Sequence, residues 1–543
     1  MVVARIPVAV DDPLVASQYG FRPETVETQD EAFFLDGPVA SRVAVVDRDP
    51  ATGQLTIPVP WRSKQRRFVT SKDSLSPAAI ALSVFGLVLK TISLFERPDV
   101  LGHPISWAFS RPQLLVVPQA GTWANAFYDR YSSSLQFFTF SAPDGSLVRT
   151  ALSRDIVTHE SGHAILDSLA PALYDAVSPE TLALHEAIGD LTAVCMALES
   201  HAIREWLVQH RQGRIYGSTP ASQLANQFGD ALNKHHPLRD TSNDLRLSDV
   251  DSQEPHSLSQ VLTGAAWAAM TQLHDHSMQD AIADQSTSTE SVEAKALGVS
   301  ARRITRILFR ALDYVAPAEA TFADYVRAVL VADTRAYPED ESGYRRTFND
   351  EFKKRGIPGD LQANLPDEHL RVDVDDLLES DWTAYEFTDK HKSLLGVPAK
   401  GPFRVFPRRE SQRQYYVGEG KRETRREVIL QVTWEGSEPN GDVLSLPSSR
   451  AVFKGTTIVI DGRADRRGRY PVLSCLSTDS GEHQVAARTE AVRRLADAGQ
   501  LLFASRWQAN DIRPLAPVVF ARTAQNVLRL RGTARLLHLA GVN

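Results

Sequence analysis

The stretch that decides the fold is SRDIVTHESGHAILDSLAP, residues 153–171, which contains the pattern HESGH at positions 159–163. A serine that can cap a helix precedes a run whose apolar side chains recur on one face, and a proline closes the run. Residues four apart share a helix face, so His159 and His163 can present two imidazoles to one tetrahedral zinc ion, while Glu160 points toward the same opening. The alternative is an amphipathic helix with two exposed histidines, although a chain of this composition would contain HExxH by chance on the order of 0.03 times.

A second helix, predicted over residues 178–190 (SPETLALHEAIGD), offers the remaining ligand. A catalytic zinc ion needs a third protein ligand and one open position for water. Ser-Pro is typical of a helix start, and Glu186 and Asp190 then lie four apart on one face. Glu186 could bind the metal, and Asp190 could accept a hydrogen bond from the second ring nitrogen of a ligand histidine. His185 is a rival ligand that points about 100° away on the helix, and a solvated acidic face is the alternative interpretation.

The two helices together resemble those of the thermolysin-like zinc peptidases, in which HExxH is followed by a helix carrying E-x-x-x-D. NAFY at positions 125–128 resembles the family's edge-strand motif, and DSQEPH at positions 251–256 resembles its D-x4-H element. The resemblance implies Glu160 as the general base and the zinc ligands His159, His163 and Glu186. It further implies that Tyr174 and His256 donate to the transition-state oxyanion, with Asp251 orienting His256. The residues that it implies for substrate binding are Asn125, Ala126 and Arg239.

Composition and charge divide the chain into parts. With 543 residues, 43% of them hydrophobic and 23% charged, the sequence is that of a globular protein and excludes collagen-like, coiled-coil and wholly disordered classes. Residues 401–543 hold 23 Lys and Arg against 14 Asp and Glu, whereas the whole chain has a net charge of −7. We therefore predict an α+β fold, in which the resemblance implies a two-lobed thermolysin-like catalytic unit. The predicted parts are a β-rich N-terminal lobe over 1–152, a helical zinc-binding lobe over 153–357, and an additional α+β C-terminal region of unknown role over 358–543.

The resemblance implies a zinc-dependent endopeptidase that hydrolyses internal bonds of a peptide or protein substrate with a water activated by zinc. A zinc aminopeptidase is one alternative, but the G-x-M-E-N element that holds a free amino terminus in such enzymes does not occur in the sequence. Another is an inactive or structural-zinc scaffold whose Arg-rich clusters, KRETRRE at 421–427 and ADRRGRY at 464–470, bind a partner. Acids interleaved with these arginines, and the lack of an aromatic stacking pattern, argue against nucleic acid as that partner.

Zinc is the expected cofactor, and the sequence argues against the calcium site that the family commonly has. Asp155 would fit one calcium position, but Ala197 stands where an acid is expected. Asp11 and Asp12 interrupt the stretch where a secretory signal needs apolar residues, so we expect a cytoplasmic protein or export by a non-classical route. The apolar run at 74–89 is short for a bilayer and predicts a core helix, so no transmembrane segment is expected. The sequence leaves the oligomeric state open.

Overall fold

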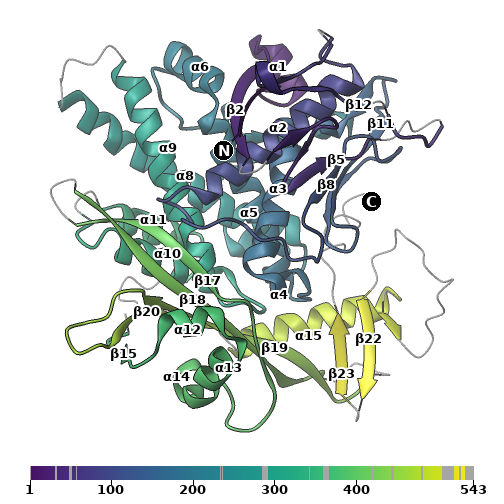
Figure 1. Cartoon of the computed structure of the whole chain (residues 1–543). Coiled ribbons are helices and arrows are strands. Elements are labelled where there is room, and N and C mark those ends of the chain that lie inside the picture. Colours follow the sequence, from purple (N-terminus) through teal and green to yellow (C-terminus); the bar gives the residue numbers. More distant parts are fainter. Residues whose placement is uncertain are drawn as a thin grey trace.

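The structure of the chain is a computed structural model, shown in Figure 1, and its class is the mixed α+β class that the sequence predicts. The residues that it describes are 2–30, 33–47, 52–56, 58–71, 73–232, 234, 237–283, 291–340, 343–358, 366–417, 421–441, 446–478, 481–499, 501–503, 519–524 and 527–531.

Two small sheets form the N-terminal part of the fold. Four strands pair in the order β2-β1-β7-β6 and six in the order β3-β4-β5-β8-β10-β9, so β9 lies at an edge of its sheet among the described strands. The hairpin of β11 and β12 leads into the helical part. The bounds are β1 (Val2–Val8), β2 (Glu24–Asp30), β3 (Phe34–Leu35), β4 (Val39–Ala40), β5 (Val43–Val45), β6 (Trp61–Arg62), β7 (Arg67–Phe68), β8 (Leu114–Val117), β9 (Ala126–Asp129), β10 (Ser134–Phe137), β11 (Thr139–Ser141) and β12 (Leu147–Arg149).

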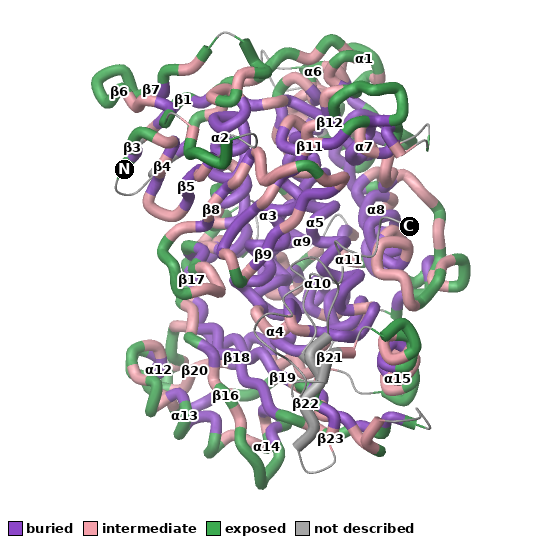
Figure 2. The backbone as a smooth tube through the Cα atoms, turned by 90° about the vertical axis from the view of Figure 1, so that its right-hand side faces the viewer, coloured by how far each residue is buried: buried purple, intermediate pink, exposed green. Residues whose placement is uncertain are grey.

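Helices form the core of the molecule, and α3 and α5 are buried along nearly their whole length, as Figure 2 shows. The predicted core helix exists as α2, which begins with a serine N-cap and a proline. Helices α2 and α5 are long and apolar enough to cross a membrane, but 72% and 100% of their apolar windows lie inside the protein. The bounds are α1 (Pro13–Tyr19), α2 (Pro77–Glu96), α3 (Arg154–Leu169), α4 (Pro171–Tyr174), α5 (Pro179–Glu199), α6 (His201–Arg211), α7 (Asn226–Ala231), α8 (Pro255–Ala283), α9 (Val292–Arg310), α10 (Phe322–Ala336) and α11 (Tyr344–Lys354), with the short strands β13 (Gln223–Leu224) and β14 (Arg239–Asp240) between α6 and α8.

The C-terminal part is built on a sheet with nine described strands, around the long strands β18 and β19. In Figure 1, α12, α13 and α14 lie on the side of this sheet that faces away from the helical core. The bounds are β15 (His369–Leu370), α12 (Val374–Glu379), α13 (Asp381–Lys390), α14 (Lys392–Leu395), β16 (Phe403–Val405), β17 (Arg409–Tyr416), β18 (Arg422–Pro439), β19 (Ser449–Asp461), β20 (Tyr470–Ser477), α15 (Glu482–Asp497), β21 (Leu501–Phe503), β22 (Val519–Ala524) and β23 (Val527–Arg531).

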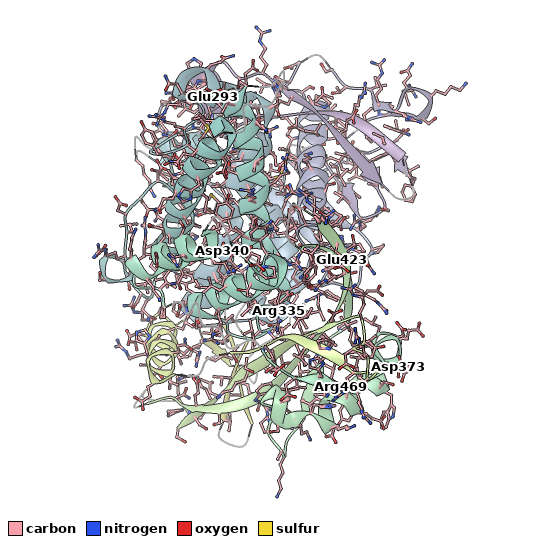
Figure 3. All side chains as sticks on the ribbon, turned by 90° about the vertical axis from the view of Figure 1, so that its left-hand side faces the viewer. Glu293, Arg335, Asp340, Asp373, Glu423 and Arg469 are labelled. Carbon is pink, nitrogen blue, oxygen red and sulfur yellow. The ribbon has the colours of Figure 1, made fainter. Side chains whose placement is uncertain are left out.

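Strand alternation lets this sheet contribute to two cores. Val428 and Leu430 of β18 pack with α12 and α13 in a separate hydrophobic cluster, whereas Ile429 between them packs into the main core of the molecule. The same alternation places Val459 of β19 in the main core and its neighbours in the smaller cluster. Successive side chains of a strand point to opposite faces, so one face of the sheet covers the helical part. Arg335 of α10, labelled in Figure 3, donates to the Leu473 carbonyl of β20 at this junction, at 2.7 Å.

Candidate metal centre and cleft

Two glycines allow helices α3 and α5 to pack closely enough to form one site. A Cβ at Gly189 would lie 2.7 Å from the His159 ring, and a Cβ at Gly162 would lie 2.7 Å from the Thr192 hydroxyl. Neither glycine has a positive φ, so the requirement is space between the helices and not backbone conformation. The predicted helices therefore exist, and these glycines bring their predicted faces into contact.

The predicted zinc ligands lie together where the two helices meet. The Nε2 atoms of His159 and His163 are 3.0 Å apart. Oxygen atoms of Glu186 lie 3.5 Å from His159 Nε2 and 3.4 Å from His163 Nε2. All three side chains are buried, and Glu186 Oε1 has no hydrogen-bond partner within the described part of the chain. Two imidazole nitrogens and a buried carboxylate at one point form a donor set that fits zinc, and a tetrahedral ion held by these three groups would take one further ligand.

The charge of Glu186 is favoured by its neighbours. Burial opposes its ionisation, but the nearby His256 and the two histidines His159 and His163 together hold its pKa well below the usual value. The carboxylate is therefore charged at neutral pH, as metal binding requires.

Hydrogen bonds fix the orientation of both ligand histidines. Asp190 Oδ1 lies 2.9 Å from His159 Nδ1, in the position predicted for it. His185 Nδ1 lies 3.4 Å from His163 Nδ1, so His185 contacts the ring of His163 at the nitrogen opposite to the one that lies near Glu186. The sequence predicts His185 only as a rival ligand. Its position one residue before Glu186, on the adjacent face of the helix, is the feature that could have indicated a contact with His163.

Glu160 lies close to the two histidines: a carboxylate oxygen of Glu160 and one ring nitrogen each of His159 and His163 lie within 4.8 Å of one another. Its Oε2 accepts a hydrogen bond from the Tyr128 backbone N–H of strand β9 at 2.9 Å. Burial raises the pKa of Glu160 to about 8, with His159 opposing the rise and Glu186 adding to it. A divalent cation beside the carboxylate favours its charged form, so metal binding would convert Glu160 into a base.

These groups open into a cavity of about 360 Å³. Asn125 and Ala126, at the edge strand β9, line one side of it, as predicted for substrate contacts. Arg239 lines the other side, and its guanidinium contacts Asp190 at 2.9 Å and Glu186 at 3.6 Å. The structure thus brings all three predicted substrate-binding residues to the cavity that His159, Glu160 and Glu186 also line.

His256 also lines this cavity, but its partner differs from the predicted one. Its Nε2 lies 3.6 Å from Glu186 Oε2, and its Nδ1 lies 3.0 Å from Glu254 Oε1. The predicted partner Asp251 instead contacts Arg494 of α15 at 3.3 Å, with both side chains about half exposed. The reason is the start of α8 at Pro255, which folds Glu254 back over the first helical turn, where it also accepts from backbone N–H groups. A carboxylate two residues before the histidine at a helix start was the missed signal.

Tyr174, predicted as the other oxyanion donor, is not among the described residues that line the cavity. It is fully buried, and its hydroxyl accepts from the Arg130 backbone N–H at 3.3 Å. The Arg130 guanidinium lies 4.3 Å from the ring centroid, and the ring packs edge-on against Tyr128. The short helix α4 directly after α3 turns this side chain into the core, so the structure does not bring Tyr174 to the site.

Some arginines of the Arg-rich clusters in the C-terminal part, and the nearby Arg463, are paired with acids. Arg426 contacts Asp375 at 2.6 Å, and Arg425 contacts Glu423 at 3.2 Å. Glu423 also pairs with Arg463. Charges that are neutralised in this way leave less basic surface for a partner than the sequence clusters suggest.

Comparisons with known proteins give matches among solved structures alone. No protein-family model matches the chain, and no curated protein matches it. A solved structure titled as the precursor of protealysin, a metalloproteinase from Serratia proteamaculans, matches at 13% identity and a TM-score of 0.35, over 61% of this chain and 90% of that one. Values this low carry no argument about function, which rests on the site itself.

Proposed function

We propose that the chain is a zinc-dependent endopeptidase. The observation that carries the proposal is the meeting of His159, His163 and Glu186 with Glu160 in a cavity beside the edge strand β9. In this proposal the catalytic unit consists of the β-rich part over 1–152 and the helical part over 153–357, because the cavity is lined from both.

A bound zinc ion would supply a Lewis acid that lowers the pKa of a water molecule and polarises a carbonyl group. Glu160 takes the proton from the attacking water and passes it to the leaving amine, a role worth about 10²- to 10⁴-fold in rate. His256, which lines the same cavity as Glu160, donates to the oxygen that becomes negative, with Glu254 holding its ring. Asp190 keeps the ring of His159 in the orientation that presents Nε2 to the metal.

The edge strand supports a peptide as the substrate. An extended peptide can add to an open sheet edge through backbone hydrogen bonds, with pockets reading alternate side chains. Asn125 and Ala126 at the start of β9 line the cavity, and Arg239 offers donors opposite them. The Tyr128 N–H of the same strand holds Glu160, so the strand that would bind substrate also positions the base.

The test combines metal content with peptide hydrolysis. Purified protein should contain one zinc ion per chain and cleave quenched-fluorescent peptides, and a chelator should abolish cleavage reversibly. Glu160→Gln should keep its zinc and lose at least 100-fold in kcat, while Glu205→Gln, exposed on α6, should behave as the parent. Cleavage by Glu160→Gln at the parental rate would refute the proposal. Peptides with blocked and free amino termini should be cut alike, whereas an aminopeptidase would cut only the free ones.

A further inference from the structure

Tyr128 joins the edge strand β9 to helix α3 at two points. Its backbone N–H donates to Glu160 Oε2 at 2.9 Å, and its hydroxyl donates to Asp167 Oδ2 at 2.7 Å. Glu160 and Asp167 are seven residues apart on α3, so they lie on the same face of the helix, about two turns from each other. The helix that carries the predicted base therefore also holds the side chain of the strand residue that contacts this base.

Asp167 also accepts from Arg130, the residue that directly follows β9. Arg130 Nε lies 2.8 Å from Asp167 Oδ2 and 3.1 Å from Oδ1, and Nη2 contacts the same carboxylate. Nη1 reaches Asp175 at 3.0 Å, and Nη2 also donates to the carbonyl of Pro171. A contact of two guanidinium nitrogens with one carboxylate is strong and fixes direction as well as distance. The end of β9 is thus fastened to the segment that leads from α3 through α4.

These contacts lie inside the protein. Tyr128 is 1% exposed and Asp167 is 0% exposed. Burial raises the pKa of the Tyr128 hydroxyl well above its usual value, and Asp167 adds to the rise, so the hydroxyl keeps its proton and remains a donor. Asp167 therefore receives hydrogen bonds from two residues at the end of one strand, in a buried network that favours a single arrangement.

We propose that Asp167 is a positioning residue of the peptidase site: through Tyr128 and Arg130 it holds β9 where the Tyr128 N–H meets Glu160. Among the described strands β9 pairs with β10 only, and its other side must stay open if a substrate peptide is to add there. The anchor to α3 constrains the strand without occupying that side. Asp167 is not among the described residues that line the cavity, so it acts through β9 and not on substrate. The inference rests on the proposed peptidase function.

The decisive variant is Tyr128→Phe, which removes the bond to Asp167 and leaves that carboxylate paired with Arg130. The matched control is Tyr325→Phe, because Tyr325 is also fully buried and its hydroxyl donates to the Leu308 carbonyl at 2.9 Å, between α10 and α9. The zinc-loaded full chain is assayed with quenched-fluorescent peptides, and kcat is expressed per bound zinc ion. Tyr128→Phe should lower this kcat about 10- to 100-fold, because a small displacement of the strand misplaces both the base and the substrate.

Tyr325→Phe loses an equivalent buried bond, so it should be destabilised to a similar extent while its kcat per zinc ion stays at the parental value. A purely structural bond at Tyr128 would give the same result as this control. Parental kcat per zinc ion in Tyr128→Phe, with zinc-dependent cleavage by the parent, therefore overturns this inference alone. Absence of cleavage of any peptide by the parent contradicts the proposed function and overturns both.

A second measurement does not depend on catalysis. Hydrogen exchange, followed by mass spectrometry on a fragment that spans residues 124–131, reports the protection of the β9 amides, including the one at position 128. Exchange in this fragment should be about tenfold faster in Tyr128→Phe than in the parent, and it should be unchanged in Tyr325→Phe. Parental exchange in Tyr128→Phe would show that the bond to Asp167 does not hold the strand, and the inference would then be wrong.

Discussion

Replacing Arg413 by methionine should strongly destabilise the junction between the C-terminal sheet and the helical part. Arg413 lies on β17 with its side chain 0% exposed. Its guanidinium donates to Glu427 Oε2 at 2.9 Å and to the Leu101 carbonyl at 2.8 Å, and it also contacts Asp313. The side chain therefore joins three segments that are far apart in the sequence.

The size of the effect follows from what remains after the change. Asp313 would keep His103 at 2.9 Å and Arg409 at 3.2 Å, and Glu427 would keep Arg310 at 2.9 Å. Removing one partner of a buried pair costs roughly 3 to 5 kcal/mol. Because each carboxylate keeps a cationic neighbour, we expect the lower end of that range, about 3 kcal/mol.

Denaturant unfolding measures this loss as a shift in the midpoint of the transition in which the sheet leaves the helical part. The matched control is Arg463→Met, which removes an arginine that is 53% exposed and pairs with Glu423. An exposed pair contributes about 0 to 1 kcal/mol, so this variant should unfold close to the parent. A loss below about 1 kcal/mol for Arg413→Met, or one equal to that of Arg463→Met, would refute the reasoning.

The same network predicts a dependence on pH. Burial opposes ionisation of Asp313, but His103, Arg409 and Arg413 hold its pKa well below the usual value, and the pKa of Glu427 is lowered in the same way by Arg413 and Arg310. A carboxyl with a depressed folded-state pKa stabilises the fold fully above its unfolded pKa, about 4, and loses that stabilisation as the pH falls through the folded value. The difference between the parent and Arg413→Met should therefore be constant near neutral pH and shrink below about pH 4.

Two changes at the candidate site separate positioning from binding. His185→Ala should weaken zinc affinity by about 10- to 100-fold in competition with a chelator, because His163 loses the group behind it, while His185→Asn, which restores an acceptor, should lose less. Glu254→Gln should lower kcat about tenfold with little change in KM, since a hydrogen bond to a charged group orients His256. Asp251→Asn should leave kcat within twofold. A larger loss of kcat in Asp251→Asn than in Glu254→Gln would show that Asp251 orients His256, as the sequence predicts.

The parts of the site that could be predicted from sequence are those fixed by helix periodicity. His159, His163, Glu186 and Asp190 meet because each pair lies four apart on a helix, and that spacing sets the face whatever the rest of the chain does. The edge strand at Asn125 also lies where its motif indicated, beside the cavity.

The two predicted site residues that lie elsewhere in the structure, Asp251 and Tyr174, have positions that depend on where a helix or turn begins. The start of α8 at Pro255 decides that Glu254, and not Asp251, reaches His256. Tyr174 has the spacing of a donor, but the turn after α3 directs it into the core. Spacing along the chain cannot specify such directions, because they depend on packing against segments distant in sequence.

The C-terminal region is tied to the elements that hold the site, although nothing in its sequence predicted this. Arg409 of β17 donates to the carbonyl of Leu169, the last residue of α3, at 2.9 Å. A cation there complements the negative end of the helix that carries His159 and His163, the two predicted ligand histidines. Arg494 of α15 contacts Asp251, in the loop that leads to His256. Strand β17 therefore supports the end of α3, and α15 contacts the loop before His256. Arg413→Met, which loosens the buried junction, should thus lower zinc affinity as well as stability. If the C-terminal region were joined to the helical part only through the chain, the same substitution would leave the zinc affinity unchanged.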